Sequence, residues 1–97
     1  MSETGNRIKE RRQLLKMSME ELASAVGYSS ATRKTIVYNV ESGKNEAPLS
    51  KITEYAKALH TNTYYLLGIS MVSELTDDDI IVWMSGVKNS EDDGNHG

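Results

Sequence analysis

The stretch from residue 18 to residue 43 has the pattern of two short helices joined by a turn, and this pattern limits the possible folds most. Ser18 followed by Glu21 predicts a capping box at the start of the first helix, because each side chain can bond the backbone N–H of the other residue. Gly27 predicts the end of that helix, since glycine adopts positive φ at low cost. An apolar stripe at Ile36, Val37 and Val40 predicts the next helix. These features suit a helix-turn-helix, and an ordinary helical hairpin in a small bundle also fits them.

The remaining segments also show helical patterns, and together they predict an all-α fold. Helices are expected over residues 4–16, 19–26, 31–42 and 49–59, in a short segment from Asn62 to Gly68, and in a sixth helix capped at Thr76. In the helix expected over residues 4–16, Ile8, Leu15 and Met17 should face inward, and Arg7, Lys9, Arg11 and Lys16 should be solvated. In the fourth helix, Ile52, Tyr55, Ala56 and Leu59 form the expected buried face.

Length and composition indicate one small domain without disulfide bonds or structural metal sites. The chain has 97 residues and no cysteine, so it carries neither a disulfide nor a cysteine-based metal site. We expect no metal and no cofactor, because the acidic run Asp77–Asp79 is better explained as a helix cap than as a calcium loop. No apolar run approaches the ~20 residues that cross a membrane. A cytoplasmic protein without membrane contact is therefore expected.

The net charge of −3 is unevenly distributed along the chain. Residues 1–70 carry ten Lys and Arg against seven Asp and Glu, a net charge of +3, and residues 71–97 carry a net charge of −6. An acidic tail of residues 89–97, expected to be disordered, thus follows a mildly basic body. Binding to a polyanion would have to be focused on one face of that body.

Three motifs in order carry a family resemblance: E-E-L-A at residues 20–23, E-S-G-K at 41–44 and A-K-A-L-H-T-N-T-Y-Y-L-L-G at 56–68. From about Arg7 to Gly68 the chain resembles the phage-repressor/Cro-type (XRE) helix-turn-helix DNA-binding family. The resemblance implies an ion pair between Arg12 and Glu41. One departure is clear: about four residues more than the family spacing separate Gly27 from Glu41, roughly one helical turn. These residues either lengthen the turn or extend the helix of residues 31–42 at its start.

In the helix expected over residues 31–42, the face opposite the apolar stripe is the candidate DNA-reading surface. Its expected base-contacting residues are Thr32, Lys34, Thr35, Tyr38 and Asn39. Lys can donate to guanine, Asn can pair with adenine and Thr can contact a thymine methyl group. The expected contacts to the DNA backbone come from Ser18, Arg33, Lys44 and Asn45. The alternative is that this face is simply solvated. If the extra residues shift the register, Ser30 and Thr32 become the readers.

The resemblance implies a transcriptional regulator of phage or prophage type that binds a palindromic double-stranded operator as a homodimer. An antitoxin that binds both its operator and a partner protein is the alternative. Nothing in the sequence resembles a catalytic constellation, so we expect no enzyme. Residues 1–70 would be the DNA-binding domain, 71–88 a dimerisation helix and 89–97 the tail. The dimer residues are expected to be Ile80, Ile81, Trp83, Met84 and Val87, unless this apolar surface covers the five-helix core.

Overall fold

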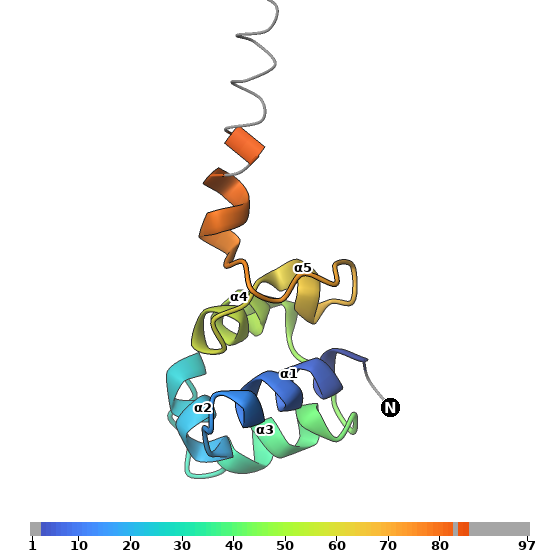
Figure 1. Cartoon of the computed structure of the whole chain (residues 1–97). Helices are drawn as coiled ribbons and strands as arrows, with labels where there is room; N and C mark the ends of the chain where they lie inside the picture. Colours follow the sequence, from blue (N-terminus) through green and yellow to red (C-terminus); the bar gives the residue numbers. More distant parts are fainter. Residues whose placement is uncertain (1–2, 83, 86–97) are drawn as a thin grey trace, which may run out of the picture.

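The computed structural model describes residues 3–82 and 84–85, and within these ranges all regular structure is helical, as predicted. The helices are α1 (Glu3–Leu14), α2 (Met19–Val26), α3 (Arg33–Glu41), α4 (Leu49–Ala58) and α5 (Thr63–Leu66). Residues 77–82 and 84–85 are also helical, and we call these residues the C-terminal helix. Helix α2 packs on α3 and α4, and α1 contacts α3 and α5 (Figure 1).

Helix α2 has the bounds and the caps that the sequence predicts. The Ser18 hydroxyl accepts a hydrogen bond from the Glu21 backbone N–H at 3.0 Å, and the Glu21 carboxylate accepts one from the Ser18 N–H at 2.9 Å. Gly27 ends the helix with a φ of 103°, in the left-handed region that favours glycine. Local chemistry is thus sufficient to define this helix.

The predicted start of α3 was wrong, and the difference decides where the extra residues lie. The helix begins at Arg33 rather than at residue 31, so residues 27–32 form the turn after α2. The Ser30 hydroxyl accepts the Thr32 N–H at 3.2 Å, a local bond that competes with helical pairing. The additional residues therefore lengthen the turn instead of extending α3. Helix α1 likewise ends at Leu14, two residues earlier than predicted, and Lys16 then adopts a φ of 57°.

The core lies where α1, α2, α3, α4 and α5 meet. Its fully buried apolar side chains include Ile8, Leu22, Val37, Tyr55 and Leu59, together with Leu66 from α5. Leu15 and Met17 pack partly against this cluster, as expected. Gly5 sets the distance between α1 and α3, because a Cβ atom at this position would overlap the carbonyl oxygen of Val40. The same close approach places the end of α3 beside α1.

Two arginines of α1, expected to be solvated, are buried. Arg7 is 9% exposed and donates to the carbonyl oxygens of Tyr65 and Ser70, and its guanidinium lies 4.4 Å from the Tyr65 ring centroid. Arg11 is 5% exposed and donates to the carbonyl oxygens of Leu59 and His60 at the end of α4. The prediction failed because both guanidinium groups donate to carbonyl oxygens that are distant in the sequence. Arg11 supplies donors to carbonyl groups at the end of α4, where helical partners are lacking, and Arg7 bonds α5 and the segment after it.

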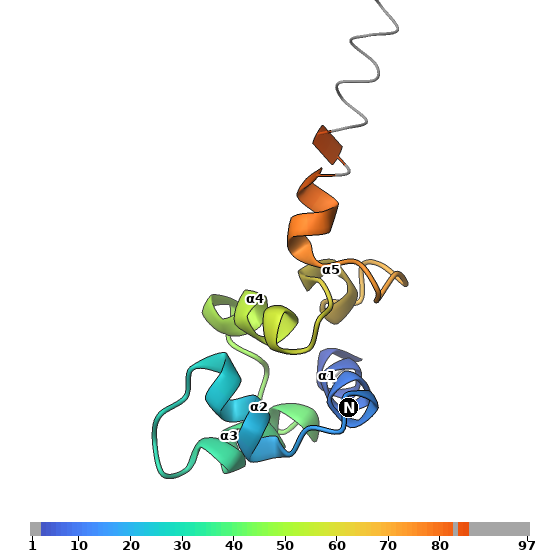
Figure 2. The ribbon, with the colours of Figure 1, turned by 60° about the vertical axis from the view of Figure 1, so that its left-hand side comes forward.

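The C-terminal helix begins at the predicted cap and extends away from the body. Thr76 and Asp79 bond each other's backbone N–H groups at 3.0 and 3.1 Å. This helix and α3 lie at opposite ends of the described structure in both views (Figures 1 and 2). Trp83, Val87 and the tail of residues 89–97, on which the sequence also makes predictions, lie outside the described residues.

Candidate nucleic-acid interface

Helix α3 lies along the edge of the molecule (Figure 1), and the polar side chains on one of its faces are exposed to solvent. Val37 and Val40 point into the core with 0% and 2% exposure, so the helix is fixed by its apolar side. Lys34, Thr35 and Tyr38 are exposed on the other side, and Asn39 is half-buried at its flank. The face therefore offers a cation, a hydroxyl, a phenol and an amide, which are groups that hydrogen-bond to base edges.

The carboxylate of α3 is removed from this face by an ion pair. Glu41 is buried, and it accepts hydrogen bonds from Arg12 Nε at 2.7 Å and from Arg12 Nη2 at 3.0 Å. Arg12 also donates to the carbonyl oxygen of Met17 at 2.9 Å. The pair that the resemblance implies is thus present. It ties α1 to the end of α3 and leaves no uncompensated negative charge on α3 itself.

Arg33, expected to contact a phosphate, is engaged within the protein. Its Nη2 donates to the Glu20 carboxylate at 2.6 Å and its Nη1 to the Ser30 carbonyl oxygen at 3.3 Å. A phosphate contact would have to compete with these bonds. Glu20 was not singled out from the sequence, because the two residues lie on different helices and only the fold brings them together.

The turn of residues 27–32 is anchored at one point and exposed elsewhere. The ring of Tyr28 packs edge-on against Tyr55, with 6.4 Å between centroids, and Lys51 Nζ lies 5.4 Å from the Tyr28 centroid. Burial raises the pKa of the Tyr55 hydroxyl well above its ordinary value. Ser30 and Thr32 are exposed, and their hydroxyl oxygens are 3.0 Å apart. The turn therefore presents hydroxyl groups immediately before the exposed face of α3.

The three remaining candidate contacts to a DNA backbone lie at the start of α2 and after α3. Ser18 is exposed, although its hydroxyl also caps α2. Lys44 and Asn45 are exposed in the loop that follows α3. The backbone N–H of Asn45 donates to the carbonyl oxygen of Asn39 at 3.0 Å, so this loop is held against the end of the helix. The structure thus places candidates at the start of α2 and in the loop after α3.

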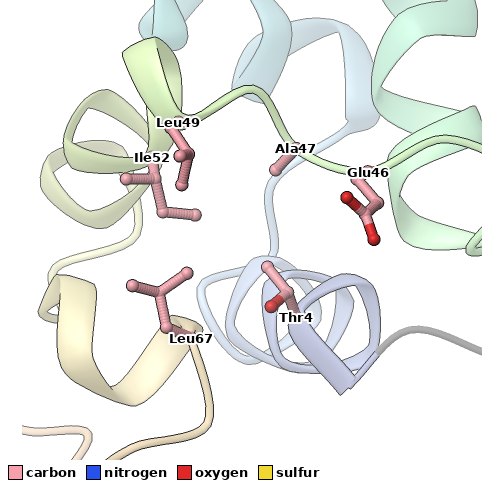
Figure 3. A pocket seen from close by; sticks show the side chains of 6 residues that line it. All are labelled: Thr4, Glu46, Ala47, Leu49, Ile52 and Leu67. Carbon is pink, nitrogen blue, oxygen red and sulfur yellow. The ribbon is translucent and has the colours of Figure 1, made fainter.

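Three cavities in the part of the chain that the structure describes lie away from the exposed face of α3. One, of about 270 Å³, lies between α1, the loop before α4, α4 and α5 (Figure 3). Leu49, Ile52 and Leu67 face one another on one side of it, and Thr4 and Glu46 lie on the other. It is slightly smaller than typical small-molecule sites of about 300–1,000 Å³. Within residues 3–82 and 84–85, no three His, Cys, Asp or Glu side chains come together to hold a metal ion.

Comparison with known families identifies the fold. A helix-turn-helix family model matches residues 8–66, which span α2, α3, α4 and α5 together with most of α1. Neither a curated protein nor a solved structure matches the chain. In the part of the chain that the structure describes, no helix is long and apolar enough to cross a membrane. The match covers more than half of the chain, and the chain therefore belongs to the XRE-type helix-turn-helix family of DNA-binding transcription regulators.

Proposed function

We propose that this protein is a cytoplasmic, sequence-specific repressor of phage or prophage type that binds a double-stranded DNA operator as a homodimer. It carries out no catalysis in this proposal. Helix α3 enters the major groove and reads base edges, and α2 lies across the sugar–phosphate backbone. The domain of residues 1–70 makes these contacts, and the segment of residues 71–88 joins the two copies.

The exposed face of α3 is the observation that carries the proposal. Lys34, Thr35 and Tyr38 project outward together, while Glu41 is neutralised by Arg12 in the interior. A polar face without free carboxylates can approach DNA without repelling its phosphates. With the turn lengthened, Thr32 occupies the N-cap position of α3 without a side-chain capping bond. It lies next to the first helical residues, which are the positions that contact bases in helix-turn-helix proteins.

Contacts to the DNA backbone come from the loop after α3 and from the start of α2 in this proposal. Lys44 and Asn45 lie in the loop that is bonded to Asn39, and Ser18 lies at the start of α2. Arg33 joins them only if phosphate displaces Glu20 from its guanidinium group. These contacts fix the orientation of the protein on DNA, and the face of α3 supplies the discrimination between sequences.

Selection of bound fragments from random double-stranded DNA tests the proposal. The full chain is expected to enrich one sequence with two-fold symmetry, whose half-sites are separated by about 34 Å, one turn of DNA. An enriched sequence without symmetry would reject the dimer and keep sequence-specific binding. If no sequence is enriched at any salt concentration, the proposed function is wrong.

A further inference from the structure

The apolar side chains of the C-terminal helix are not used to cover the core. Ile81 is 61% exposed, Val82 is 71% exposed and Met84 is 55% exposed. Ile80 is only half-buried. The helix also lies beyond residue 66, where the family match ends. Its apolar surface therefore serves neither the core nor the part of the chain that the family shares.

Hydrogen bonds hold this helix in one direction relative to the body. The Asn62 side chain donates to the carbonyl oxygens of Val72 and Leu75, both at 2.8 Å, and Thr61 donates to Ser73 at 2.7 Å. The Asp77 carboxylate accepts the Thr63 N–H and hydroxyl, both at 2.8 Å. We call these bonds, together with that from Arg7 to Ser70, the clasp. Thr61 and Asn62 are buried, so the side-chain ends of their bonds in the clasp are shielded from water.

A groove lies beside the base of the C-terminal helix. It has a volume of about 510 Å³ and is lined by Thr53, Lys57, Thr63, Tyr64, Asp77 and Ile81. Its walls come from α4, α5 and the C-terminal helix itself. Since the clasp directs the helix away from the body, the helix does not fold back into the groove of its own chain.

We propose that this groove and the apolar side chains of the C-terminal helix form a two-fold interface with a second copy of the chain. A two-fold contact uses the same surface on both copies, so that surface must offer both a projection and a recess. Here the two are adjacent, because Ile81 belongs to the helix and also lines the groove. The inference rests on the proposed function, since it specifies the surface through which the proposed dimer forms.

Charge and position favour a second copy as the occupant. Three acidic residues, Asp77–Asp79, begin the helix, so the surface repels DNA. Lys57 lines the groove and is opposite in charge to the acidic start of the helix, whereas the Asp77 carboxylate in the groove is bonded to Thr63 of its own chain. Because α3 lies at the other end of the molecule, this pairing leaves both reading helices free (Figure 1).

Analytical ultracentrifugation of the full chain tests the interface with two variants and a matched control. Ile81→Asp places a charge on the helix, and Thr53→Arg fills the groove from α4. Leu14→Asp is the control, because Leu14 is 65% exposed on α1 and resembles Ile81 in size and exposure. We expect both interface variants to raise the dimer dissociation constant at least about tenfold, equivalent to about 1.4 kcal/mol, and the control to leave it unchanged. Circular dichroism verifies that each variant is folded.

The outcomes separate this inference from the proposed function. A dimer that persists in Ile81→Asp contradicts the interface, and so does a wild type that stays monomeric or pairs with a different protein. If only Ile81→Asp acts, the helices pair with each other and the groove is not involved, which overturns the proposal as stated. Binding of wild type to DNA is measured in parallel. A dimer that binds no DNA rejects the proposed function and leaves the interface intact.

Discussion

Arg12 on α1 and Glu41 at the end of α3 form a two-bonded ion pair in the interior of the protein. The pair lies near Gly5, where α1 passes closest to the backbone of α3. It therefore connects the helix that supports the fold to the helix that presents the candidate DNA-reading face. Both charges are nearly removed from water, so each depends on the other for its stabilisation.

Arg12→Ala is expected to lower the free energy of unfolding by about 3–5 kcal/mol, because it leaves Glu41 as a buried charge without its partner. Lys9→Ala is the control, since Lys9 is exposed on the same helix. Urea denaturation followed by circular dichroism measures both changes. Equal, small effects from the two substitutions would show that the pair does not stabilise the fold.

Asn62→Ala tests the clasp and is expected to destabilise the protein more than the loss of an exposed helix cap. The residue caps α5 through its oxygen, and its nitrogen donates to two carbonyl groups of the following segment. Ser18→Ala removes only a cap on the surface and is expected to cost about 1 kcal/mol. Chemical denaturation compares the two variants. If they cost the same, the two bonds to the segment after α5 contribute nothing measurable.

The contrast between these two caps indicates what the sequence could and could not predict. Local patterns were sufficient for α2, the core of α4 and the Ser18 and Asn62 caps, because their partners lie within a few residues. The burial of Arg7 and Arg11 depends on carbonyl groups about fifty residues or more away, which helical periodicity does not report. A regular spacing of four residues, shared by Glu3, Arg7 and Arg11, was the one available signal that these side chains lie on one side of α1.

The candidate DNA interface could also be predicted only in part. The apolar stripe of α3 predicted which face of the helix points outward. It did not predict where α3 begins, because Ser30 and Thr32 bond within the turn. The engagement of Arg33 by Glu20 depends on the packing of α2 against α3 and could not be inferred from either segment alone. Which bases are contacted, and by which residues, remains a prediction.

Acidification is expected to weaken the cap of α2. The Ser18 backbone N–H, followed by its hydroxyl, lowers the pKa of Glu21 below its ordinary value of 4.5. A carboxylate with a lowered pKa in the folded state stabilises the protein fully above its unfolded pKa and loses this effect as the pH falls through the folded value. The melting temperature of Glu21→Ala should therefore lie below wild type at neutral pH, and the difference should disappear in acid.

Glu10→Ala provides the control for that experiment, because Glu10 is an exposed carboxylate on α1. Its melting temperature is expected to follow that of wild type across the same pH range. A difference between wild type and Glu21→Ala that stays constant down to acidic pH would mean that the ionised carboxylate is not what stabilises the cap.

Binding to DNA is expected to weaken steeply as salt increases, because each phosphate neutralised by the protein releases about 0.9 counterion. Lys44→Ala should reduce the slope of log affinity against log salt by about 1 and weaken all sequences alike. Lys9→Ala should leave the slope unchanged. Titration of a labelled duplex over a series of salt concentrations measures the slopes. A slope near zero for wild type would contradict binding to the phosphate backbone.

The most direct test of the central claim, that the exposed face of α3 reads base sequence, is selection from random DNA with wild type, Lys34→Ala and Lys9→Ala in parallel. Wild type and Lys9→Ala are expected to enrich the same sequence. Lys34→Ala is expected to lose the preference at one defined base pair of each half-site, by about 1–3 kcal/mol, while the preferences elsewhere in the site remain. Loss of affinity without any change in base preference would mean that Lys34 contacts a phosphate and not a base. If none of the exposed α3 positions, substituted in the same way, alters the selected sequence, the assignment of α3 as the reading helix is wrong.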